Sequence, residues 1–313
     1  MSKFTVSRSE VINAPVEKVF EVVRDFNQSR GWSPWYHMEP ELVPEVIGNW
    51  NEVWDVQKWD GKRVGAGEIE HVAINQNDSI LQELRFIKPW KATNHTSFDF
   101  EEVDGATKIT WSMHGSLPFF MFWMKKMMTT WVGMDYERGL KCLKCYVENW
   151  GVPSQTQVHW IIETAKKYYV GIQTSCSIDD LPSRMKKDFK TLTTFSESKL
   201  PAGTQHMFSI YEKWDILKSE TTYVAAIELA DDSGDEIMAD DMVSGVIPAW
   251  EVVHTTHTWA YDYLGNAWSA GMAEVRALKK NLRKWLMGWE TYGNSPENTD
   301  PKDLITNIYI PIR

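Results

Sequence analysis

The chain has 313 residues and a formal net charge of -10 at pH 7. This length fits two domains of about 150 residues, each large enough to bury its own core. The acidic balance offers no basic surface for phosphate backbones, so nucleic-acid binding is not expected. No stretch approaches the ~18 consecutive apolar residues of a membrane span, and the N-terminal segment lacks an apolar leader. We therefore expect a soluble, cytoplasmic protein without a membrane span.

The cysteine and tryptophan contents are both informative. The three cysteines cannot all pair, and the CxxC motif of Cys142 and Cys145 falls late in a predicted helix without further soft ligands. Neither a metal site nor redox chemistry is expected, and no cofactor is implied. Seventeen tryptophans are an unusual surplus. Such rings fill cores first, but they also suit the walls of wide apolar cavities.

The N-terminal half begins with a strand over residues 4–12, followed by a helix whose first turn is preset by Pro15. Its apolar residues recur at helical spacing: Val16, Val19, Phe20 and Val23. Several strand-like runs follow, and in the last of them Trp111 and Met113 alternate with polar residues. A long helix is expected at roughly 119–150. This order predicts an α+β domain in which a curved antiparallel sheet grips a C-terminal helix.

The segments INAPVEKVFEVVRDFNQSRGWSPW, GKRVGAGEIE, LRFIKPW, ATKITWSMHG and GLKCLKCYVE resemble the SRPBCC (START-like) superfamily. The resemblance covers residues 3–149 and is closest to the branch of polyketide cyclases/dehydrases and lipid transport proteins of bacteria. It implies a helix-grip fold around a deep apolar cavity but no single reaction. Trp111 and Met113 are candidate cavity residues from their alternation. The resemblance adds Trp35, Trp54, Trp90, His114 and Trp123.

Domain boundaries are predicted at 1–150 and 158–313, joined by a linker at 151–157 that is rich in Pro, Gly, Ser and Gln. In the second domain one pattern runs twice. The first pass has a strand pair at 159–176, a helix at 180–198 and strands at 206–214 and 221–229. The second has a strand at 250–259, a helix at 263–286 and final strands that include 306–312. We predict a pseudo-twofold α+β domain whose two helices flank a groove.

The segments YVAAIEL, MVSGVIPAWEVVHTTHTWAYDYLGNAW and DPKDLITNIYIPI resemble the GyrI-like family of small-molecule-binding, effector-binding domains. In bacterial regulators of that kind a DNA-binding module accompanies the domain, whereas here the first domain takes that position. The resemblance also implies that a groove-facing Glu of the last strand is replaced by Asn307. A neutral amide there favours a neutral or polar ligand, or a site whose charge comes from elsewhere.

Asn307 and Tyr309 are the first candidate ligand-binding residues, because they share one face of the last strand. If the two passes superpose, Tyr223 and Ala225 take the corresponding places, and all four line the groove. Three tryptophans are candidates for its aromatic walls or for core: Trp214, Trp259 and Trp268. His254 and His257, three apart on a strand, point to opposite faces and cannot readily share a metal ion.

The sequence favours a binding protein with two apolar pockets, which senses, sequesters or carries small lipophilic or aromatic compounds. The alternative is a hydrolase or cyclase that acts on lipophilic or electrophilic compounds. The hydrolytic version is weakened because Asn307 cannot act as a general base. Whether the chain is an enzyme stays open, with non-catalytic binding favoured. A third possibility is a regulator that acts through an unidentified partner protein and needs an exposed apolar patch.

Overall fold

The structure is a computed structural model that describes residues 2–117, 123–201 and 206–313. The chain divides into two compact units, Met1–Ser154 and Gln155–Arg313. The first strand of the second unit begins at Gln155, so it includes the end of the segment predicted as a linker. Among the described helices none is long and apolar enough to cross a membrane.

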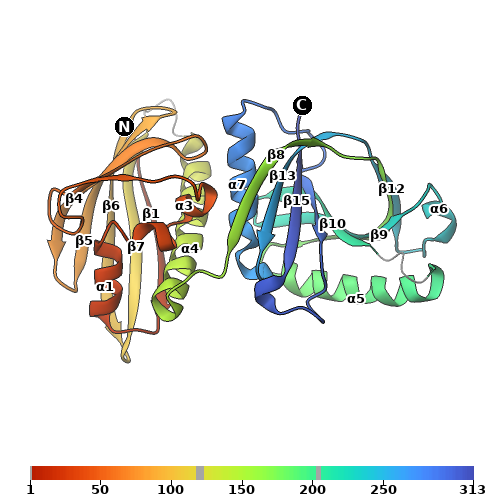
Figure 1. Cartoon of the computed structure of the whole chain (residues 1–313), viewed down its shortest axis with the longest axis horizontal. Helices are drawn as coiled ribbons and strands as arrows, with labels where there is room; N and C mark the ends of the chain where they lie inside the picture. Colours follow the sequence, from red (N-terminus) through yellow and green to blue (C-terminus); the bar gives the residue numbers. More distant parts are fainter. Residues whose placement is uncertain (1, 118–122, 202–205) are drawn as a thin grey trace. The chain divides into compact units, whose positions relative to one another are not determined.

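The N-terminal unit is a seven-stranded antiparallel sheet of order β1-β7-β6-β5-β4-β3-β2 (Figure 1). Its strands are β1 (Ser2–Ile12), β2 (Glu45–Ile47), β3 (Val56–Gly61), β4 (Gly65–Asn75), β5 (Ser79–Lys88), β6 (Ala92–Val103) and β7 (Ala106–Leu117). Its helices are α1 (Val16–Arg24), α2 (Ser29–Trp32), α3 (Pro34–Met38) and α4 (Lys125–Asn149). The long helix follows the sheet in the chain, as predicted, and residues 119–122 of the predicted helix lie outside the described residues.

The long helix α4 packs against the sheet through small and aromatic residues. A Cβ added at Gly139 would come within 2.8 Å of the Trp111 ring, so glycine permits this close approach. One turn earlier, the Tyr136 ring stacks on Trp111 with centroids 4.0 Å apart. Val19 and Phe20 of α1 complete the same core and are fully buried. The predicted helix-grip α+β architecture is confirmed.

The C-terminal unit is an eight-stranded sheet of order β12-β9-β11-β10-β14-β15-β13-β8. Its strands are β8 (Gln155–Glu163), β9 (Lys167–Ser177), β10 (Met207–Asp215), β11 (Glu220–Leu229), β12 (Val243–Ile247), β13 (Glu251–Thr258), β14 (Gly288–Tyr292) and β15 (Ile305–Pro311). Its helical segments are α5 (Leu181–Lys199), α6 (Gly234–Ile237), α7 (Leu264–Ala277) and the short 3-10 turns η2 (Tyr261–Tyr263) and η3 (Pro301–Asp303).

The strand order of this unit has the predicted pseudo-twofold symmetry. From one edge the order is β12, β9, β11, β10, and from the other edge it is β8, β13, β15, β14. The symmetry therefore relates β9-α5-β10-β11 to β13-α7-β14-β15 and exchanges the two edge strands. Both long helices cover the same face of the sheet, since Leu192 of α5 packs with Ala225 and Val275 of α7 packs with Ile308.

Two predicted elements of this unit are wrong. The segments at 159–176 are strands but not a pair, because β8 joins β13 and β9 joins β11 at opposite ends of the sheet. The predicted helix at 263–286 ends at Ala277. The apolar residues beyond it serve other contacts: Leu282 bridges to Ile312, and Leu286 packs in the core on the sheet's other face.

Candidate functional site

A buried carboxylate, Glu290 of β14, lies at the centre of the C-terminal sheet. The indole Nε1 of Trp268 on α7 donates a hydrogen bond to its Oε1 at 2.5 Å. Its Oε2 accepts from the hydroxyls of Tyr211 at 3.2 Å and Tyr292 at 3.1 Å. The Tyr292 hydroxyl also lies 2.6 Å from the Ser209 hydroxyl. Sheet and helix thus supply three neutral donors to one carboxylate.

Burial controls the protonation of this cluster. Glu290 is 2% exposed, and loss of hydration raises its pKa from 4.5 to about 6, although the three hydrogen bonds act in the opposite direction. Burial and the neighbouring carboxylate raise the pKa values of Tyr211 and Tyr292 well above 10. The phenols therefore remain donors, and Glu290 is mostly ionised at neutral pH.

Aromatic rings surround this carboxylate. Tyr211 meets Trp268 edge-on at 5.4 Å, and Tyr292 meets Phe189 of α5 at 5.8 Å and Tyr261 at 5.7 Å. Tyr261 is 40% exposed, so the cluster borders solvent on that side. A carboxylate near several aromatic rings can attract a cation through its charge, and the rings can add cation–π contacts.

The sheet register explains why these side chains meet. Ser209 and Glu290 pair directly across β10 and β14, and Ala225 and Ile308 continue the same row on the flanking strands. A twofold axis through the Ser209–Glu290 pair relates Tyr211 to Tyr292, each two residues further along its strand. The pseudo-symmetry therefore places the two phenols, of Tyr211 and Tyr292, beside the Glu290 carboxylate.

Asn307 and Tyr309 do not belong to this cluster. They pair with Thr291 and Trp289, so they point to the face opposite Glu290, away from the two helices. There the Asn307 Oδ1 accepts from the Thr256 hydroxyl at 2.9 Å and lies 3.1 Å from His254 Nε2. The prediction that Asn307 and Tyr309 share a groove with Tyr223 and Ala225 is wrong, because the two passes align with a one-residue shift.

The remaining C-terminal candidates lie on or near the helix-covered face. Trp268 contacts Glu290 directly. Trp214 meets Tyr211 edge-on at 5.8 Å. Tyr223 is buried, and its hydroxyl donates to Asp188 of α5 at 2.7 Å. Trp259 is half-buried directly after β13, where its N–H donates to the Leu304 carbonyl. Whether any of them contacts a ligand stays a prediction.

In the N-terminal unit, Trp111 and Met113 are buried in the core, each 4% exposed. Trp35 is half-buried and meets Trp111 edge-on at 5.6 Å. The Trp111 Nε1 donates to Thr96 Oγ1 at 2.9 Å, so its polar group is satisfied inside the protein. The other candidates lie at the surface, and whether any of them contacts a ligand stays a prediction: Trp54, Trp90, His114 and Trp123.

Glu290 was missed in the sequence because its strand is short and directly follows a segment with helical apolar spacing. The alternation in WETY carries a weak signal, with Glu290 and Tyr292 on one face and Trp289 on the other. A single Glu in a five-residue strand resembles a solvated edge position. Its burial follows from β14 occupying the centre of the sheet, which no local pattern indicates.

Comparisons with known proteins bear on the two units unequally. Residues 3–148 match the family model described as polyketide cyclase / dehydrase and lipid transport, so this part of the chain is similar to that family. No curated protein matches the chain.

Solved structures resemble parts of the chain at low identity. Protein CV1439 from Chromobacterium violaceum is 17% identical, with a TM-score of 0.37, over 46% of this chain and 96% of its own. The Aha1 dimer from Colwellia psychrerythraea is 16% identical, with a TM-score of 0.36, over 47% and 97%. The C-terminal domain of EcmrR is 18% identical, with a TM-score of 0.41, over 51% and 98%.

Proposed function

We propose that the chain is a cytoplasmic small-molecule-binding protein whose C-terminal domain binds small lipophilic cations at Glu290. The observation that carries the proposal is a buried carboxylate whose three hydrogen-bond donors are all neutral. A buried anion without a cationic partner is costly, by several kcal/mol even after relaxation, and a bound cation offsets that cost. The expectation of a neutral ligand rested on Asn307, which faces the other side of the sheet.

In the N-terminal domain, the family match and the ring cluster around Trp111 support binding of a lipophilic compound. Its candidate contacts are Trp35, Trp111 and Met113. With two such domains the protein is suited to sense, sequester or carry lipophilic compounds.

Thermal unfolding of the full chain tests the cation site. Benzyltrimethylammonium and its uncharged carbon isostere, neopentylbenzene, differ only in charge. At about a hundred times the dissociation constant, binding adds roughly 2.7 kcal/mol to the stability of the folded state. We expect the cation to raise the Tm of the wild type but not of Glu290→Gln, and the isostere to lack this dependence. Equal stabilisation of both proteins by the cation excludes Glu290 as the anchor.

A hydrolytic function is a second candidate, favoured by the chemistry of Glu290 itself. A carboxyl group with a pKa of about 6 can exchange a proton at neutral pH, and the adjacent phenols can donate to a developing oxyanion. The test is hydrolysis of a panel of epoxides by the wild type and by Glu290→Gln. Hydrolysis that is lost in Glu290→Gln, while the variant still binds the uncharged epoxides, supports this function. Absence of turnover across the panel leaves binding as the function.

A further inference from the structure

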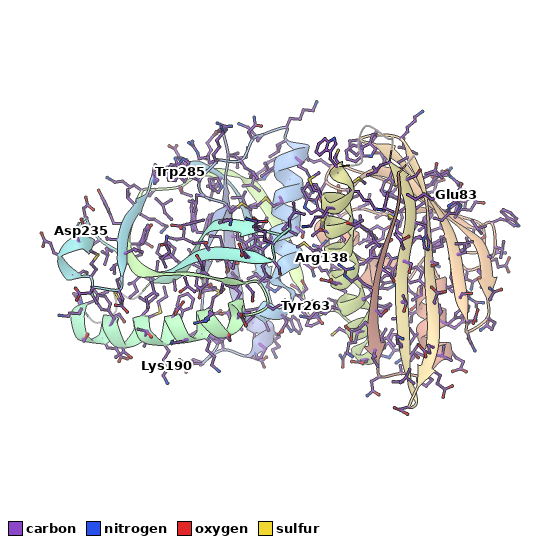
Figure 2. The ribbon with its side chains drawn as sticks, turned by 180° about the vertical axis from the view of Figure 1, so that it is seen from behind. Glu83, Arg138, Lys190, Asp235, Tyr263 and Trp285 are labelled. Carbon is purple, nitrogen blue, oxygen red and sulfur yellow. The ribbon has the colours of Figure 1, made fainter. Side chains whose placement is uncertain are left out.

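A second buried carboxylate lies beside the Glu290 cluster. Asp188 of α5 is 8% exposed, and its Oδ2 accepts from the hydroxyls of Tyr223 and Thr174, both at 2.7 Å. Among the described residues no hydrogen bond is donated to its Oδ1. Figure 2 shows Lys190 on the outer side of α5, and two residues earlier the helix turns Asp188 toward the sheet.

The two carboxylates are joined by a platform of tyrosines. Tyr211 and Tyr223 pair directly across β10 and β11, and their hydroxyls donate to Glu290 and Asp188 respectively. Directly paired side chains have Cβ atoms about 5 Å apart, and each hydroxyl bonds to its own acid, so the two carboxylates are at most on the order of 10 Å apart. Helix α5 spans this gap, because Met185, one turn before Asp188, has its sulfur 3.8 Å from the Tyr211 hydroxyl.

In the part of the chain that the structure describes, the two carboxylates have no positively charged hydrogen-bond donor. Within the described residues, every hydrogen-bond donor to these two acids is a neutral hydroxyl or indole. A metal ion is not indicated, because among the described residues no three metal-ligating side chains gather here. An elongated organic molecule with a positive charge at each end reaches both acids and crosses the tyrosine rings between them.

We propose that the preferred ligand is a lipophilic dication, with one positive group at Glu290 and the other at Asp188. This inference rests on the proposed cation site and extends it to a specific class of ligand. The Asp188 Oδ1 is the acceptor for the second group, and the Tyr211 and Tyr223 rings line the apolar middle of the ligand.

Calorimetric titration of the full chain tests the assignment with two probes that share one ring: 1,4-bis(aminomethyl)benzene and 4-methylbenzylamine. We expect the diammonium compound to bind the wild type at least about tenfold more tightly, the effect of one well-placed charge pair. Asp188→Asn should remove the advantage of the diammonium compound over the monoammonium compound. Glu290→Gln should weaken both. Equal wild-type affinities, or a preference that survives Asp188→Asn, overturn the dication assignment.

Two further measurements keep the test decisive if Asp188→Asn disturbs folding. Tyr223→Phe removes a donor but leaves the Asp188 charge, so the diammonium preference should persist, and its loss contradicts a charge-based site. In the wild type, affinity across α,ω-diammonium alkanes should peak at one chain length, whereas no dependence on length contradicts two fixed anchors. If monoammonium binding depends on Glu290 but neither a diammonium preference nor an optimum chain length is found, the cation site at Glu290 is supported and the dication assignment is wrong. If no ammonium compound binds, the proposed function fails with it.

Discussion

The Trp268 indole reaches from α7 to Glu290 on β14, so a single hydrogen bond ties the helix to the buried carboxylate at the centre of the sheet. The same indole meets the Tyr211 ring edge-on, and the Tyr211 hydroxyl donates to the other carboxylate oxygen. Packing of α7 and the charge state of Glu290 are therefore coupled.

Trp268→Phe should test this coupling. The variant keeps an aromatic ring but leaves the buried Oε1 without its donor, which should cost about 1–3 kcal/mol of unfolding free energy at pH 8. Losing a bond to the ionised form should also raise the Glu290 pKa above about 6. Denaturant unfolding measures the first effect and a ¹³C-detected titration of Glu290 the second. Trp259→Phe is the matched control, and equal costs for both variants would contradict the coupling.

The raised pKa of Glu290 predicts a defined pH dependence of stability. The folded protein binds this proton more tightly than the unfolded chain, so the stabilisation is complete below pH 4.5 and is lost as pH rises through about 6. The difference between the two pKa values corresponds to about 2 kcal/mol. Between pH 4 and 7 the unfolding free energy of the wild type should fall by that amount relative to Glu290→Gln. Denaturant titrations of both proteins at each pH measure this difference, in which the contributions of other titrating groups cancel. A constant difference between the two proteins means that Glu290 titrates normally.

Glycine at position 288 is required by the site. A Cβ there would lie 2.5 Å from the Tyr309 carbonyl oxygen and 2.9 Å from the Trp268 ring. Gly288→Ala should therefore displace Trp268, lower the unfolding free energy by about 1–3 kcal/mol and weaken cation binding. Gly265→Ala is the control on α7, since its Cβ would meet nothing within 4 Å. Thermal unfolding with and without benzyltrimethylammonium reports both effects, and an unchanged ligand shift in Gly288→Ala would contradict this role.

The sequence was sufficient for the architecture because periodic apolar residues determine each element's core face. Ile308 and Ile310 alternate with Asn307 and Tyr309, and the structure buries the isoleucines as that alternation predicts. It was insufficient for the site, because a period of two does not say which face of the sheet the helices cover. Trp268 was a candidate because of its residue type. The position of its partner Glu290 follows from the placement of β14 between β10 and β15, which the whole sheet determines.

The N-terminal domain should be sensitive to acid through His71. Its ring is fully buried, stacks on Phe26 at 4.1 Å and bonds to the Arg24 carbonyl, and burial lowers its pKa from 6.5 to about 4. The contribution of neutral His71 to the unfolding free energy is present above pH 6.5 and is lost as pH falls through about 4. The loss amounts to up to about 3 kcal/mol. His71→Gln should remove that dependence. The exposed His114, replaced in the same way, should leave it intact, and an acid transition unchanged in His71→Gln would assign it to other groups.

The buried hydroxyl of Thr96 holds the ring cluster of the N-terminal domain in place. It donates to the Ser112 carbonyl at 2.8 Å, accepts from the Trp111 indole and lies 3.1 Å from the Tyr136 hydroxyl. Thr96→Val preserves shape but leaves the indole and phenol without this partner, so it should cost about 1–3 kcal/mol. Thr110→Val, whose hydroxyl meets Ser9 at the surface, should change stability by less than about 0.5 kcal/mol. Denaturant unfolding compares the two variants. A cost at Thr96 no greater than at Thr110 would show that the stacked rings alone, with Tyr136 on Trp111, hold α4 against the sheet.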